Sequence, residues 1–133
     1  MEFEFRGKSE YGKWIEGDLI CYKNGYYSIN TGFSAYGYEA SEIINRTKVD
    51  AKTIGQYIGL KDINYKKIYS GDIVRFFDLG VTKQIGYVDF RNGSFMIDTG
   101  LTTWYCWTDY DVEVIGNIHD NKNLLDFDVE EDK

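Results

Sequence analysis

The residues of this chain that could do chemistry are one histidine, two cysteines and several aspartates, and their spacing argues against a reactive site. His119 is the only histidine, and neither Cys21 nor Cys106 belongs to a Cys-x-x-Cys pair. A zinc site needs three or four ligands, and a Ser-His-Asp triad needs a serine in a strained turn such as Gly-x-Ser-x-Gly, which this sequence lacks. A Cys-His dyad stays open on spacing alone. We therefore expect no catalytic residue, no metal site and no cofactor, and we interpret the cysteines as buried thiols.

The aspartates offer one candidate cluster, formed by Asp98, Asp109 and Asp111 around Tyr110. The cluster lacks the further acid, the glycine and the distal glutamate that an EF-type calcium loop requires. A hydrolase with paired carboxylates is an alternative, but no other residue in the sequence supports it. We favour a solvent-exposed rim of a sheet and predict that the protein is not an enzyme.

Two Gly-Asp pairs, Gly17-Asp18 and Gly71-Asp72, each precede two aliphatic residues. An aspartate at such a position commonly accepts hydrogen bonds from backbone N–H groups and so stabilises a turn. We therefore predict that all four residues belong to structural turns.

The elements around these residues read as short strands joined by glycine-containing turns. The chain has 14 glycines, 12 tyrosines and no proline, and Asn24-Gly25 and Asn92-Gly93 are strong hairpin signals. Alternation of apolar and polar residues predicts strands near residues 2–6, 12–22, 26–30, 56–60, 72–77, 83–90, 94–98, 102–107 and 111–118. The predicted fold class is all-β with minor helix, as two small barrel-like β lobes packed as one compact chain.

The predicted domain organisation has four parts. Residues 1–33 form an N-terminal β lobe, 34–54 a partly helical linker, 55–125 a C-terminal β lobe with a Gly-Asp turn, and 126–133 a frayed acidic tail. Within the linker, Asp50 is a candidate N-cap for a single helical turn.

One predicted strand is apolar on both faces. Trp104 lies on one face with Cys106, and Tyr105 and Trp107 lie on the other. Such a strand belongs either in the core or at an interface. We take Trp104, Tyr105 and Trp107 as a candidate interface and expect self-association to a homo-oligomer.

The balance of charge limits the possible partners. The net charge is −7, and a protein that binds DNA phosphates needs cations to displace their counterions. No apolar run approaches the roughly 18 residues of a membrane-spanning helix. We expect binding neither to duplex DNA nor to a membrane.

A resemblance to a known family is carried by eight residues in the middle of the chain, with further matches toward both ends. They are Gly55, Gln56, Tyr57, Gly59, Leu60, Asp62, Ile68 and Tyr69. In this order they resemble the motif of the YopX family of phage and prophage proteins, whose activity is unassigned. Ile58 stands where the family usually has threonine, and Tyr65 where it usually has glycine. The second departure suggests that Asn64 takes any positive φ in that turn.

The resemblance implies an all-β protein with barrel-like parts, encoded by a phage or prophage, and it supplies no catalytic residues. We expect an accessory protein in the cytoplasm of the bacterial host that acts non-enzymatically, through protein–protein contact and self-association. Its partners are expected to be itself and a host or phage protein. The alternatives are a nucleic-acid-binding β module, or an acidic decoy of a DNA-binding host protein.

Overall fold

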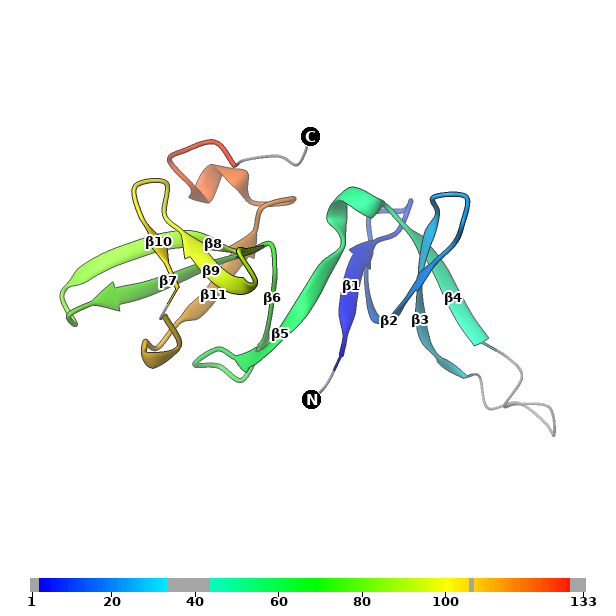
Figure 1. The fold of residues 1–133 in the computed structure, drawn as a ribbon, viewed down its shortest axis with the longest axis horizontal. Coiled ribbons are helices and arrows are strands. Elements are labelled where there is room, and N and C mark those ends of the chain that lie inside the picture. Colours follow the sequence, from blue (N-terminus) through cyan, green and yellow to red (C-terminus); the bar gives the residue numbers. More distant parts are fainter. Residues whose placement is uncertain (1–2, 34–43, 106, 130–133) are drawn as a thin grey trace. The chain divides into compact units, whose positions relative to one another are not determined.

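The computed structural model describes residues 3–33, 44–105 and 107–129, and the regular secondary structure in these residues is mostly β-strand (Figure 1). The chain divides into two compact units, Met1–Tyr57 and Ile58–Lys133. The all-β prediction is confirmed, since the helical elements among the described residues are 3₁₀ turns of three residues each. The strands are β1 (Phe5–Lys8), β2 (Trp14–Cys21), β3 (Tyr27–Phe33), β4 (Ile44–Val49), β5 (Gly55–Lys61), β6 (Lys67–Tyr69), β7 (Asp72–Asp78), β8 (Thr82–Arg91), β9 (Ser94–Asp98), β10 (Thr103–Trp104) and β11 (Glu113–Asn117). The 3₁₀ turns are η2 (Ala51–Thr53), η3 (Trp107–Asp109) and η4 (Lys122–Leu124).

The strands form two sheets with open ends. One has the order β4-β3-β2-β1-β5-β6 and the other the order β10-β9-β8-β7-β11. The barrel-like part of the prediction is therefore corrected for the described residues. The end strands β6 and β10 have only three and two residues, too few to continue the ladder of hydrogen bonds around a closed barrel.

In the first unit, β1 and β4 are not neighbours in the sheet order, but they approach closely where β1 carries a glycine. Ile29 and Val49 are buried. A Cβ added at Gly7 would lie 2.9 Å from the Cβ of Val49, so the glycine leaves room for the valine.

The prediction of a turn at Gly17-Asp18 is wrong, because both residues lie inside β2. Gly17 is opposite Phe5 of β1. A Cβ at Gly17 would lie 2.1 Å from the carbonyl oxygen of Asn30 on β3. Glycine is needed here for close packing of strands, which a sequence pattern cannot distinguish from a need for a turn.

Part of the predicted linker, 34–54, is not a linker, because it forms a strand and a 3₁₀ turn of the first unit. Residues 44–49 form β4, which pairs with β3 in antiparallel register. Asp50 does cap η2, since its Oδ1 accepts a hydrogen bond from the Lys52 backbone N–H at 3.0 Å. Residues 34–43, with most of the expected helical turns, lie outside the described residues. The boundary between the units falls after Tyr57, inside β5.

The second unit contains two groups of buried apolar residues. The larger consists of Ile68, Val74, Phe76, Val88, Ile97, Trp107 and Val112. The smaller consists of Ile73, Tyr87 and Leu125. Phe127 and Val129 pack against the smaller group, and the Phe127 ring fills the space beside Gly100. The predicted frayed tail is therefore corrected for residues 126–129, because these two apolar side chains hold it to the sheet; residues 130–133 are not described.

Candidate functional site

The residues with reactive side chains are dispersed over the described part of the chain. Cys21 is exposed on β2, which corrects the prediction of a buried thiol, and Cys106 is not among the described residues. The backbone N–H of His119 donates to the Asn117 side chain in the turn after β11. Among the described residues, no three His, Cys, Asp or Glu side chains are placed to hold a metal ion.

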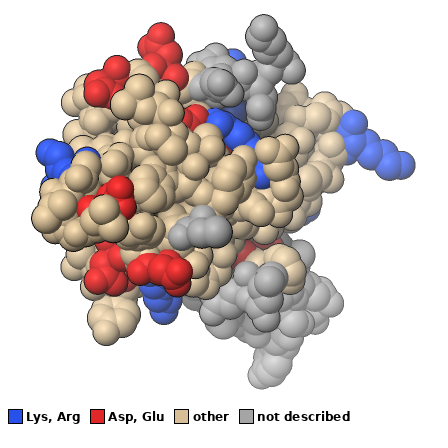
Figure 2. Space-filling model, turned by 60° about the vertical axis from the view of Figure 1, so that its left-hand side comes forward, with Lys and Arg blue, Asp and Glu red and all other residues tan. Residues whose placement is uncertain are grey.

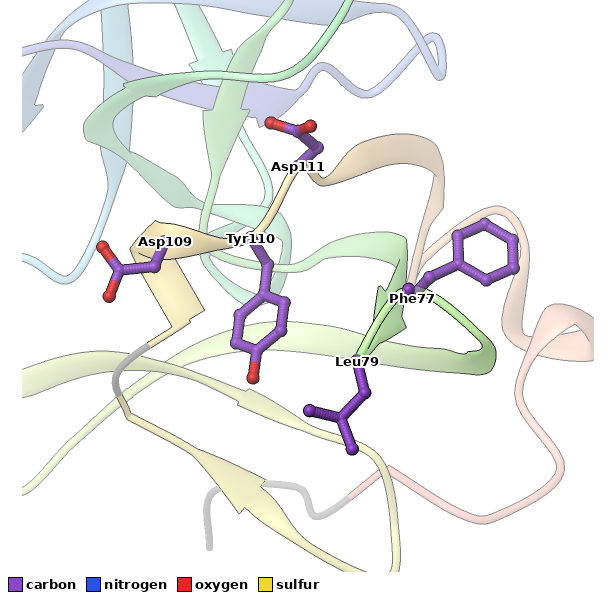
Figure 3. A pocket seen from close by; sticks show the side chains of 6 residues that line it. Phe77, Leu79, Asp109, Tyr110 and Asp111 are labelled. Atoms are coloured by element: carbon purple, nitrogen blue, oxygen red, sulfur yellow. The ribbon is translucent and has the colours of Figure 1, made fainter.

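The candidate carboxylate cluster is separated in space. Asp98 forms an ion pair with Arg91 at 3.0 Å and accepts the Gly100 N–H. Asp109 and Asp111 lie around η3, and their carboxylates point in different directions (Figure 3). They do not form the opposed pair that a glycosidase-type reaction needs.

Asp72 is a buried acid that bonds the backbone. Its side chain is at the start of β7, and only 1% of the residue is exposed. Its Oδ2 accepts a hydrogen bond from the Tyr69 N–H at 2.8 Å, across Gly71, whose φ is +93°. This is the geometry of an aspartate that caps a turn.

Asp62 connects two backbone segments, the turn that follows it and β11, a role that the sequence analysis missed. Its Oδ1 accepts hydrogen bonds from the N–H groups of Asn64 and Lys66, and its Oδ2 accepts one from Val114 on β11, at 2.8 to 2.9 Å. Burial of Asp62 opposes ionisation, but the N–H groups of Val114, Lys66 and Asn64 together hold the pKa of its carboxyl below the usual value. The only signal for this role in the sequence is the position of Asp62 directly after a strand and before a turn.

The turn after Asp62 differs from its prediction. Tyr65, not Asn64, has the positive φ, at +62°. Tyr65 thus takes the backbone conformation that glycine would adopt without strain, and its side chain is exposed. The other motif residues are divided between the core and the surface: Tyr57, Ile68 and Tyr69 are buried, whereas Leu60 is exposed.

The candidate aromatic interface does not form as predicted. The strand ends at Trp104, and Trp107 begins η3, only 2% exposed in the core of the second unit. The Trp107 Nε1–H donates to the carbonyl of Phe95. Trp104 packs edge-on against Phe76 and Tyr110. Only Tyr105 of the three predicted residues has an exposed side chain, because a strand of two residues lets the chain turn Trp107 inward.

Two shallow hollows lie next to each other on the second unit. The first, of about 480 Å³, is lined by Phe77, Leu79, Gly80, Asp109, Tyr110 and Asp111. The second, of about 190 Å³, is lined by Leu60, Lys61, Asp62, Ile63, Ile68, Trp107, Thr108, Tyr110, Asp111 and Val112. Because Tyr110 and Asp111 line both, we treat the two hollows as one surface feature, the Tyr110 groove.

Exposed apolar side chains lie at both ends of the Tyr110 groove. Leu60 and Ile63 line one end, and Phe77 and Leu79 line the other. Leu79 is 86% exposed and has a φ of +51°, in the turn between β7 and β8. A bulky residue at positive φ is rare. Neither burial nor backbone preference explains leucine at this position, and such outliers concentrate at functional sites.

The middle of the Tyr110 groove is acidic. Asp109 and Asp111 are exposed, and the Tyr110 hydroxyl is 3.4 Å from Asp78. Desolvation, the charge of Asp78 and its hydrogen bond, and the charge of Asp109 all raise the pKa of Tyr110. Among the described residues that line the groove, Lys61 is the only basic one. Figure 2 shows Asp and Glu side chains in several groups over the displayed face, separated by wide uncharged areas.

The fold and this site define a class: a small acidic protein of two β units, with an open apolar and acidic groove and without converging catalytic groups among its described residues. The chain belongs to the YopX protein family, whose sequence model matches residues 4–126. This match confirms the resemblance carried by the residues from Gly55 to Tyr69. No curated protein matches the chain. None of the helices in the described residues is long and apolar enough to span a membrane.

Proposed function

We propose that this protein is a phage- or prophage-encoded accessory protein that acts non-enzymatically in the bacterial cytoplasm, through contact between the Tyr110 groove and another protein. The observation that supports this most directly is Leu79, an exposed leucine in a strained backbone conformation at the edge of a hollow. Exposed apolar residues gathered in one place are typical of protein-binding surfaces. The groove is too open to enclose a substrate, and its two exposed carboxylates diverge (Figure 3).

The test is site-specific photo-cross-linking in bacterial cells. A photoreactive amino acid at position 79 should attach to a defined segment of a protein partner, identified by mass spectrometry. Position 101 is the matched control, because Leu101 is 98% exposed, also in a turn of the second unit, and does not line the groove. Adducts at neither position, or the same adducts at both, would contradict the proposal.

Leu79→Asn is the variant that separates binding from folding. Asparagine tolerates positive φ better than leucine does, so the fold is expected to be retained while the apolar side chain is removed. The cross-linked partner should then no longer co-purify with the variant, whereas Leu101→Asn should still bind it.

Self-association is a second contact that we propose, through a surface distinct from the groove. Its support is two exposed aromatic residues, Phe90 at the end of β8 and Tyr105 directly after β10. Asn92 in the turn between β8 and β9 donates to the Tyr105 hydroxyl at 3.2 Å. Light scattering over a wide concentration range should show a mass above that of one chain, and Tyr105→Ser should lower it. A single-chain mass at every concentration would exclude this contact.

A further inference from the structure

The partner segment that fits the Tyr110 groove can be specified further, on the basis of the proposed function. The two hollows are adjacent, because Tyr110 and Asp111 line both of them. A ligand that fills both must therefore cross these two residues. This favours a peptide segment over a compact small molecule, since an open surface of this shape buries little of a compact ligand.

The ends of the groove require apolar groups. Leu60 and Ile63 lie at one end, and Phe77 and Leu79 at the other, all of them exposed. Apolar side chains of the partner would cover these residues and remove apolar surface from water on both sides. The segment should therefore carry two apolar residues separated by a short interval.

The centre of the groove requires cations. Within the described chain, neither Asp109 nor Asp111 has an ion-pair partner, whereas Glu113 pairs with Arg75 and Asp89 pairs with Arg91. Desolvation, followed by the charge and hydrogen bond of Asp78 and the charge of Asp109, raises the pKa of Tyr110, which is consistent with a region that disfavours additional negative charge. Such a surface repels nucleic-acid phosphates and attracts lysine and arginine.

We propose that the Tyr110 groove binds a basic segment of a partner protein in which lysine or arginine residues lie between two apolar residues. The charge pattern decides between occupants: an acidic or uncharged segment would leave Asp109 and Asp111 uncompensated in the interface. The second copy of this chain is a competing occupant, and the experiment below distinguishes it.

The test uses the full chain, labelled with ¹⁵N, and three short synthetic peptides. The first has two leucines that flank two lysines; the second has glutamates in place of the lysines; the third has serines in place of the leucines. The first peptide should shift the amide signals around residues 60–63, 79–80 and 109–111, with an affinity that falls as salt is added. The other two should bind at least about tenfold more weakly.

The decisive variant is Asp109→Asn with Asp111→Asn. Two charge contacts at a surface site predict a loss on the order of tenfold in affinity for the lysine peptide and a weaker dependence on salt. Asp126→Asn with Asp128→Asn is the matched control, since it changes the net charge equally at exposed positions that do not line the groove. The control should bind as the unmodified chain does.

Three results would overturn the inference: equal binding of the glutamate peptide, equal loss in both double variants, or signal shifts outside the groove. The cross-linking experiment separates this failure from failure of the proposed function. A partner attached at position 79 through an acidic or uncharged segment, or through a second copy of the chain, would reject the basic segment and retain the protein contact. The absence of any specific adduct at position 79 would reject the protein contact itself.

Discussion

At the scale of single residues, the buried aspartates of this protein bond the backbone. Asp72 accepts the Tyr69 N–H, and Asp62 accepts three N–H groups from two separate parts of the second unit. A buried N–H group that loses its acceptor destabilises the folded state. Two predictions concern these residues.

Asp72→Ala should lower the free energy of unfolding by about 1–3 kcal/mol, because it leaves the N–H of the buried Tyr69 without this acceptor. Asp18→Ala should change it by no more than about 0.5 kcal/mol, because Asp18 is exposed in the middle of β2. Urea unfolding of the two variants provides the measurement. Equal losses would mean that the two Gly-Asp pairs have the same role after all.

Asp62 should make stability depend on pH in the acid range. Burial opposes its ionisation, but the N–H groups of Val114, Lys66 and Asn64 hold its pKa in the folded protein below the usual value, so the unfolded chain binds the proton more readily. The contribution of Asp62 is therefore complete above about pH 5 and is lost as the pH falls through the folded-state pKa. Asp62→Asn should be less stable than the unmodified chain at about pH 7, and the difference should shrink at about pH 3. A difference that is the same at both pH values would contradict this role.

The sequence was a partial guide at this scale. Gly17-Asp18 and Gly71-Asp72 have the same local pattern, yet one pair lies inside a strand and the other at a turn. What separates them is the approach of Asn30 to Gly17, a contact between strands that no local pattern encodes. The groove escaped the sequence analysis for the same reason, since its lining comes from segments as far apart as Leu60 and Val112.

At the scale of elements, the packing of one strand against the next decides which residues are buried. Residues 44–49 were predicted as part of the partly helical linker, but pairing with β3 makes them the strand β4. The strand expected over 102–107 stops at Trp104, and η3 carries Trp107 into the core. The following two predictions test the close packing at Gly17 and the burial of Trp107.

Gly17→Ala should destabilise the first unit by more than about 2 kcal/mol, since the new methyl group would meet the Asn30 carbonyl at 2.1 Å and the φ is +153°. Gly25→Ala is the control: Gly25 also has a positive φ, but a Cβ there meets no atom within 4 Å. The control should lose about 1 kcal/mol from backbone strain alone. Chemical unfolding followed by circular dichroism would measure the free energy of unfolding of both variants. An equal loss of stability in the two would show that the close contact with Asn30 does not matter.

Trp107→Ala should lower the stability of the second unit by about 3–5 kcal/mol, the range for removing a large buried aromatic side chain. The substitution also removes the hydrogen bond to the Phe95 carbonyl. Tyr105→Ala, at an exposed position, should lose much less. A folded Trp107→Ala protein with near-normal stability in urea would restore this residue to the candidate interface.

At the scale of the whole molecule, the charge is unevenly divided between the units. Residues 1–57 contain 7 basic and 8 acidic residues, and residues 58–133 contain 8 and 14, which gives net charges of −1 and −6. The unit that carries the Tyr110 groove thus holds most of the excess negative charge. The predicted domain boundaries give the same division, because residues 34–54 contain three basic and three acidic residues and residues 55–57 contain none.

Duplex DNA should not bind to this protein at physiological salt. The excess of acidic residues repels phosphates, and Arg75 on β7 is already paired with Glu113. A gel-shift titration with a DNA duplex should show no complex. A complex whose affinity falls steeply with salt would contradict the prediction.

Because the boundary between the two units lies inside β5, neither proteolysis nor recombination should separate the units cleanly. The peptide bond after Tyr57 lies within a strand, and the Tyr57 N–H is bonded to the Glu4 carbonyl at 2.8 Å. Proteases prefer exposed loop tips and frayed ends, so limited digestion should not release the two units intact. Recombination between related genes meets the same constraint. A crossover within Gly55–Lys61 would join half-strands of different origin, so this segment should be inherited whole.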